Sequence, residues 1–232
     1  MNQPDRKPSR LKQLLSRTWL YPLWASARNY ATLSGKQGHF RSALRWESVD
    51  ARGEPIPWYS YPAIEFLEQF DFSGKSVFEY GAGNSTLFWA ARAARVVSVE
   101  SNPDWHRNLS KNAPANCKLV LCPEKDRYLG AIAANDPPFD IIAIDGDHRD
   151  EAAAAAPGNL TPNGFVILDN SDWHPAACAA LRKADLIQTD FKGFLPIAGY
   201  TIATSLFLSR NVTMTPLGDT QPTPPIGSVP SQ

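Results

Sequence analysis

The sequence predicts an α/β fold in which helices cover both faces of a mostly parallel sheet. Three observations predict it. Short apolar runs alternate with helix-like segments between residues 72 and 211. A glycine-rich turn follows the first run, and acidic side chains end four later ones. Because every parallel strand pair needs a crossover connection, this alternation favours a parallel sheet over an antiparallel one.

Seven strands and six helices are expected within and just before this region. The strands are expected at residues 76–80, 95–100, 117–122, 140–145, 164–169, 185–190 and 201–208. The helices are expected at residues 62–70, 86–94, 103–112, 126–134, 149–156 and 175–184. The last two strands follow each other without a helix between them, so they are expected to form an antiparallel hairpin that closes the sheet.

Length and composition predict one domain with appended ends. The chain has 232 residues, of which 43% are hydrophobic, and 23 basic residues balance 23 acidic ones. This neutral balance gives no indication of a nucleic-acid partner. The expected segments are a basic and aromatic lead-in (1–35), a cap with a helix (36–71), the α/β domain (72–211) and a disordered Pro-rich tail (212–232).

The use of cysteine and the N-terminal sequence predict a cytoplasmic location. The three cysteines form no C-x-x-C pair, which is typical of a reducing compartment. No signal peptide or membrane-spanning run is expected. In the lead-in, Leu11, Leu14, Leu15 and Trp19 have helical spacing. The predicted helix either packs on the domain or a partner, or contacts a membrane surface peripherally.

The strongest candidate site is the turn after the first strand. There the chain reads Glu79-Tyr80-Gly81-Ala82-Gly83-Asn84-Ser85-Thr86. Gly81 and Gly83 permit a tight turn and a close approach of a ligand to the backbone, and the next helix begins at once with free N–H groups. Glu100 ends the next strand. An acidic side chain at this position accepts hydrogen bonds from ribose hydroxyls. Together these features predict a nucleoside-containing cofactor.

This pattern resembles motifs I and II of the class I S-adenosylmethionine-dependent methyltransferases. The resemblance implies a Rossmann-like, doubly wound, mostly parallel seven-stranded sheet with a C-terminal hairpin. It implies that Glu79 lies near the methionine amino group of S-adenosylmethionine and that Glu100 holds the ribose. The full set of expected cofactor-binding residues is Glu79, Gly81, Gly83, Asn84, Ser85, Thr86, Glu100, Asp126 and Asp145.

A second candidate site lies at the ends of the strands at 140–145 and 164–169. Asp145, Asp169 and Asn170 follow these neighbouring strands and supply oxygen ligands suited to Mg²⁺ or another divalent cation. They resemble the metal triad of cation-dependent O-methyltransferases. His148 and Asp145 are the expected catalytic residues, with His148 as general base. In the alternative interpretation, these side chains only shape turns and caps.

The expected function is therefore S-adenosylmethionine-dependent methyl transfer, most simply to an oxygen of a small-molecule or glycan acceptor. Trp58 is a candidate lid residue, and Tyr200 a candidate wall of the acceptor pocket. Two alternatives differ in class. An NAD-dependent oxidoreductase is disfavoured because Thr86 stands where the dinucleotide motif has its third glycine. A non-catalytic cofactor-binding scaffold is disfavoured because it has no need for clustered acidic side chains.

Overall fold

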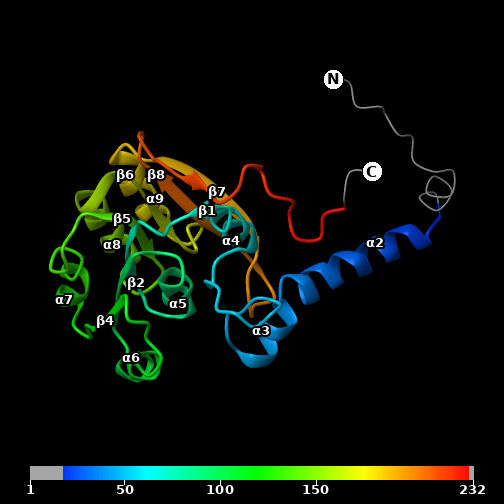
Figure 1. Ribbon diagram of the computed structural model, residues 1–232, viewed down its shortest axis with the longest axis horizontal. Helices are drawn as coiled ribbons and strands as arrows, with labels where there is room; N and C mark the ends of the chain where they lie inside the picture. Colours follow the sequence, from blue (N-terminus) through cyan, green and yellow to red (C-terminus); the bar gives the residue numbers. More distant parts are fainter. Residues whose placement is uncertain (1–17, 230–232) are drawn as a thin grey trace.

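The computed structural model describes residues 18–229 and contains the predicted seven-stranded sheet (Figure 1). Its strand order is β4-β3-β2-β5-β6-β8-β7. The strands are β2 (Ser76–Tyr80), β3 (Arg95–Glu100), β4 (Cys117–Leu121), β5 (Phe139–Ile144), β6 (Leu160–Leu168), β7 (Ile187–Phe194) and β8 (Thr201–Leu208). The first five are mutually parallel, and β8 runs antiparallel to both β6 and β7. This confirms the predicted fold class and its closing hairpin.

Helices cover both faces of the sheet. They are α4 (Tyr61–Leu67), α5 (Asn84–Ala90), α6 (Pro103–Ser110), α7 (Lys125–Gly130), α8 (Arg149–Ala155), the short 3₁₀ turn η2 (Ala156–Asn159) and α9 (Pro175–Lys183). Because successive side chains of a strand point to opposite faces, Ile142 and Ile141 of β5 enter different apolar cores. One core includes α7, α8 and α9, and the other includes α4 and α5. Both cores hold the strand ends in fixed positions.

Several predicted boundaries are corrected by the backbone conformation. Strand β7 begins at Ile187, since Asp185 has a left-handed conformation (φ 63°) that ends the preceding helix. Helix α4 ends at Leu67, and Phe70–Asp71 forms the short strand β1 instead of a last helical turn. Helix α5 begins at Asn84, directly after the glycine turn, and so brings its N-terminal N–H groups close to that turn.

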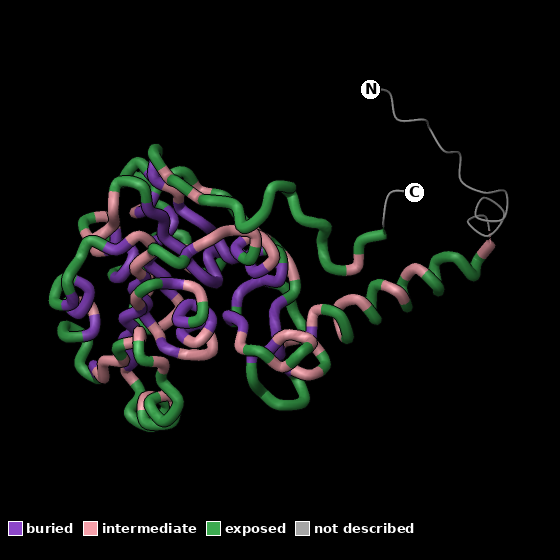
Figure 2. The backbone as a smooth tube through the Cα atoms, viewed as in Figure 1, coloured by how far each residue is buried: buried purple, intermediate pink, exposed green. Residues whose placement is uncertain are grey.

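The N-terminal region is more helical than predicted. Helix α2 (Leu20–Ala31) continues into a π-helical turn η1 (Thr32–Lys36), and α3 (His39–Arg45) lies in the predicted cap, ahead of the one helix expected there. Figure 1 shows α2 projecting away from the sheet domain, and Figure 2 shows no buried residue along it. The predicted helix at Leu11–Trp19 falls almost entirely outside the described residues.

Part of the predicted Pro-rich tail makes specific contacts with the domain. Strand β9 (Thr215–Pro216) pairs with β1 in a second, antiparallel sheet. Farther along, the Gln69 side chain accepts a hydrogen bond from the Thr223 backbone, and Glu65 accepts one from that of Ile226. The tail therefore has specific backbone partners on α4 and its C-terminal turn, which a composition-based prediction does not take into account.

Candidate functional site

Two glycine turns meet at the carboxyl edge of the sheet. Gly81 follows β2, and Gly146 follows β5, the neighbouring strand. A Cβ atom on Gly81 would lie 2.5 Å from the Gly146 Cα, and one on Gly146 would lie 2.7 Å from the Gly81 Cα. Gly81 also has a positive φ of 89°. Both positions therefore need glycine, and together they form a floor of bare backbone that a ligand is able to approach closely.

Glu79 supports this turn from beneath. Its carboxylate is fully buried and accepts hydrogen bonds from the hydroxyls of Thr86 and Ser98 (2.7 Å for Ser98). Thr86 also accepts a hydrogen bond from the Gly83 backbone N–H (2.9 Å). Burial raises the pKa of Glu79 to about 7, although nearby hydroxyl donors oppose the rise. Neither Glu79 nor Thr86 lines the cavity above the turn, so both act on it through the backbone.

Glu100 lies beside the turn, at the end of β3. One carboxylate oxygen accepts a hydrogen bond from the backbone N–H of Ala82 (3.2 Å), and the other accepts one from the backbone N–H of Asn102 (2.7 Å). Two backbone donors thus fix the orientation of a carboxylate that still lines the cavity. Asn102 caps α6 through its side chain, which sets the position of Trp105 one turn into that helix.

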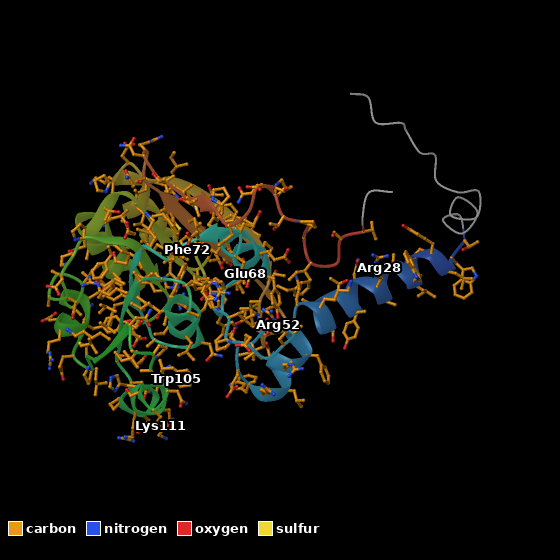
Figure 3. The ribbon with its side chains drawn as sticks, in the orientation of Figure 1. Arg28, Arg52, Glu68, Phe72, Trp105 and Lys111 are labelled. Atoms are coloured by element: carbon orange, nitrogen blue, oxygen red, sulfur yellow. The ribbon has the colours of Figure 1, made fainter. Side chains whose placement is uncertain are left out.

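Trp105 of α6, labelled in Figure 3, also lines this cavity. Its indole Nε1–H donates to the Ala82 carbonyl (2.6 Å), which holds the ring against the glycine turn. About half of the residue is exposed, so the face of an aromatic ring is available to a planar ligand. Sequence analysis missed Trp105, because nothing in the helix sequence shows that its ring reaches back to the turn.

The cavity has a volume of about 490 Å³, within the range of small-molecule sites. It brings together most of the predicted site residues: Gly81, Gly83, Asn84, Ser85, Glu100, Asp145, Asp169 and Asn170. Trp58 and Tyr200, predicted as lid and acceptor wall, also line it, as do Trp46 and Tyr128, which sequence analysis did not select. The two predicted sites are therefore two ends of one cavity.

Besides Glu79 and Thr86, two further predicted residues lie outside the cavity. His148 is exposed and is not among the residues that line the cavity. It adopts a left-handed conformation (φ 55°) as the N-cap of α8, and its ring packs against Tyr128 at a centroid distance of 6.2 Å. Asp126 is exposed in the first turn of α7 and does not line the cavity either. The structure therefore does not bring the predicted general base to the predicted acceptor site.

Arg149 lies beside Asp145 and Asn170 at the second predicted site, which is called here the acceptor end of the cavity. The left-handed turn at His148 directs the side chain of Arg149, which is largely buried, toward the ends of β5 and β6. Its guanidinium donates to the Asn170 side-chain oxygen (2.8 Å) and forms an ion pair with the Asp145 carboxylate (3.1 Å). It also donates to the backbone carbonyls of Asp145, Gly146 and Asp169 at 2.7–2.9 Å. The guanidinium thus makes four hydrogen bonds and one ion pair at this site.

The two carboxyl groups at this end differ in their surroundings. Asp145 is largely buried, which raises the pKa of its carboxyl to about 6, while the Arg149 charge opposes the rise. Asp169 is almost completely buried, and burial together with the negative charge of Asp145 raises the pKa of the Asp169 carboxyl well above its ordinary value. Asp169 also accepts a hydrogen bond from Thr204 on β8 (2.6 Å).

These residues do not fit the predicted divalent cation. The donor set that the metal would use, Asp145 and Asn170, already binds a resident cation, the Arg149 guanidinium. A metal ion close to both oxygens would face this positive charge. Among residues 18–229, no group of three His, Cys, Asp or Glu side chains is placed to hold a metal ion. Two of the three predicted metal ligands, Asp145 and Asn170, thus belong to a cluster centred on Arg149.

Comparison with known proteins identifies the fold. No protein-family model matches the sequence, and no curated protein matches it significantly. An O-methyltransferase from Bacillus cereus, solved in complex with SAH, aligns over 79% of this chain and 97% of its own, with 18% identity and a TM-score of 0.52. Precorrin-6y C5,15-methyltransferase from Geobacter metallireducens aligns over 64% and 87%, with 16% identity and a TM-score of 0.51.

The chain has a Rossmann-like α/β fold, which it shares with these two solved structures. At these identities the likeness concerns the fold alone. In a Rossmann-like fold, ligands bind outside the carboxyl ends of the strands, where the strand order reverses. Here that point lies between β2 and β5, which is where Gly81 and Gly146 meet. The fold and the cavity thus point to the same edge of the sheet.

Proposed function

We propose that this protein is an S-adenosylmethionine-dependent methyltransferase that methylates an oxygen of a small-molecule or sugar-containing acceptor. The observation that carries the proposal is the single cavity in which the glycine floor and Glu100 at one end face Asp145 at the other. The cofactor supplies a methyl group activated on a sulfonium. The protein's part is to hold the two reactants and to accept the acceptor's proton.

The cofactor end fits a nucleoside and the charged methionine moiety. Glu100 is oriented by two backbone donors and has lone pairs left for ribose hydroxyls. Trp105 offers a ring face to the adenine. Gly81 and Gly146 pack so closely that neither position has room for a Cβ atom, which leaves bare backbone at the floor. In this assignment Glu79 acts from beneath the floor, as a buried negative charge near a cofactor that carries positive charge.

Asp145 is the residue that we assign as general base. It lines the cavity, whereas His148 does not. A pKa of about 6 leaves Asp145 ionised at neutral pH and more basic than an ordinary carboxylate. As the acceptor oxygen bonds to the methyl carbon and the sulfur–carbon bond breaks, the hydroxyl proton passes to Asp145. Arg149 holds this carboxylate in place, and no step uses a divalent cation.

Calorimetry tests the cofactor assignment. S-adenosylmethionine and its demethylated product are expected to bind, with no heat from NAD⁺. Glu100→Gln should weaken binding of both by about 2–3 kcal/mol, since a charged hydrogen-bond acceptor is lost. The exposed Glu124→Gln is the matched control and should bind as the wild type does. Binding of NAD⁺ without binding of S-adenosylmethionine would support the oxidoreductase alternative instead.

A further inference from the structure

The segment 18–46, called here the N-terminal arm, exposes an unusual concentration of apolar side chains. Of the eighteen large hydrophobic side chains exposed among the described residues, nine belong to this arm. Trp24 is 56% exposed, Tyr30 67% and Leu44 75%. Scattered apolar residues are normal on a protein surface, but a gathering of this kind indicates a surface that contacts something else.

In helix α2 these side chains form one face. At 100° per residue, four of the five, Leu20, Leu23, Trp24 and Tyr30, lie within an arc of about 120°, and Tyr21 lies about 60° beyond its edge. An amphipathic surface helix normally turns this arc toward the core of its own protein. Helix α2 has no buried residue and projects from the domain, so its apolar arc faces outward (Figures 1 and 2).

The charged side chains in and just before the arm are all basic. Residues 6–46 contain nine Lys or Arg and no Asp or Glu, whereas residues 47–232 contain 14 basic and 22 acidic residues. Residues 1–17 enter here by composition alone. Within α2, the guanidinium carbon of Arg28 lies 5.6 Å from the ring centroid of Trp24, which places a cation at the edge of the apolar arc. The neutral chain is thus divided into a basic segment at residues 6–46, of which the arm holds Arg28, Lys36, Arg41 and Arg45, and an acidic remainder.

We propose that the N-terminal arm docks on the surface of an anionic lipid bilayer, with the apolar arc of α2 in the headgroup region. Tryptophan and tyrosine beside basic residues suit this interface, where an aromatic body meets hydrocarbon and a cation meets lipid phosphate. No helix among residues 18–229 is long and apolar enough to span a bilayer, so the contact is peripheral. Trp46 both ends α3 and lines the cavity, so the docked arm leads to the mouth of the site.

Vesicle flotation of the full chain tests this proposal. Vesicles of phosphatidylcholine alone are compared with vesicles that contain about one third phosphatidylglycerol. The wild type should float with the anionic vesicles only, and its binding should weaken steeply as salt is raised. Leu23→Ser/Trp24→Ser should reduce affinity by about tenfold or more, because two apolar side chains leave the interface. Its melting temperature should not change, since neither side chain is buried.

The matched control is Ile187→Ser/Leu217→Ser, which removes two exposed apolar side chains outside the arm. It should float as the wild type does. Failure of the wild type to float, equal flotation with neutral vesicles, or equal loss in both variants would overturn the proposal. So would a dimer in sedimentation equilibrium that Leu23→Ser/Trp24→Ser dissociates, because the arc would then be an interface between two copies.

Discussion

The two ends of the cavity handle charge in opposite ways. At the cofactor end, Glu100 receives hydrogen bonds only from backbone N–H groups, so its negative charge is available to a ligand. At the acceptor end, the Asp145 carboxylate is already paired with the guanidinium of Arg149. The Glu100 carboxylate therefore has no cationic side chain paired with it among the described residues, whereas the Asp145 carboxylate is paired with Arg149. Neighbouring acidic strand ends thus do not by themselves predict a metal site.

The largest expected effect concerns proton removal at the acceptor end. Asp145→Asn should lower the rate of methyl transfer by about 10²–10⁴-fold, because the amide does not accept the proton. Binding of S-adenosylmethionine should stay within about twofold, since the amide that replaces the carboxylate keeps an oxygen for Arg149. Transfer of radiolabelled methyl to an acceptor found by screening hydroxylated compounds measures the rate.

His148→Ala is the matched control for this comparison. His148 is exposed and does not line the cavity, so its loss should leave the rate within about twofold of the wild type. If His148→Ala were the slow variant and Asp145→Asn the active one, the assignment of the base would be reversed.

The next effect is on stability. Arg149→Met should lower the free energy of unfolding by about 3–5 kcal/mol, because it leaves a largely buried carboxylate and several carbonyls without their donor. Arg149→Lys should recover part of this loss, since an ammonium offers three donors instead of five. Urea unfolding followed by circular dichroism measures both.

Arg107→Ala serves as the control for this loss. Its guanidinium is exposed on α6 and pairs only with Asp104, so the change should stay within about 0.5 kcal/mol. An Arg149→Met variant as stable as Arg107→Ala would mean that Arg149 does not hold the acceptor end together.

A smaller effect comes from Glu79 beneath the glycine floor. Its pKa is about 7 in the folded protein against an ordinary 4.5, so ionising it opposes folding. This cost is absent below pH 4.5, grows as the pH rises to 7, and reaches about 3 kcal/mol. Glu79→Gln should therefore reduce the decline in stability between about pH 5 and 8 in urea titrations. An unchanged slope would show that Glu79 does not carry the cost.

The sequence predicted the sheet and the position of Gly81 and Glu100 at its carboxyl edge, because both depend on local patterns. The apolar run before Gly81 and the acidic end of β3 form local patterns that tertiary contacts do not override. The acceptor end depends instead on three separate segments. Whether Arg149 points inward is decided by the left-handed turn at His148, and sequence alone does not show that a non-glycine residue adopts this turn. The contribution of Trp105 likewise depends on its contact with Ala82.

The most direct test of the contrast between the two ends is a titration with Mn²⁺ followed by electron paramagnetic resonance. The wild-type protein, saturated with S-adenosylhomocysteine and free of other metals, is compared with Asp145→Asn. Since Arg149 already neutralises Asp145 and binds Asn170, the account predicts that the wild type takes up no Mn²⁺ beyond the level of the variant. One tightly bound Mn²⁺ per chain in the wild type, lost in Asp145→Asn, would contradict it.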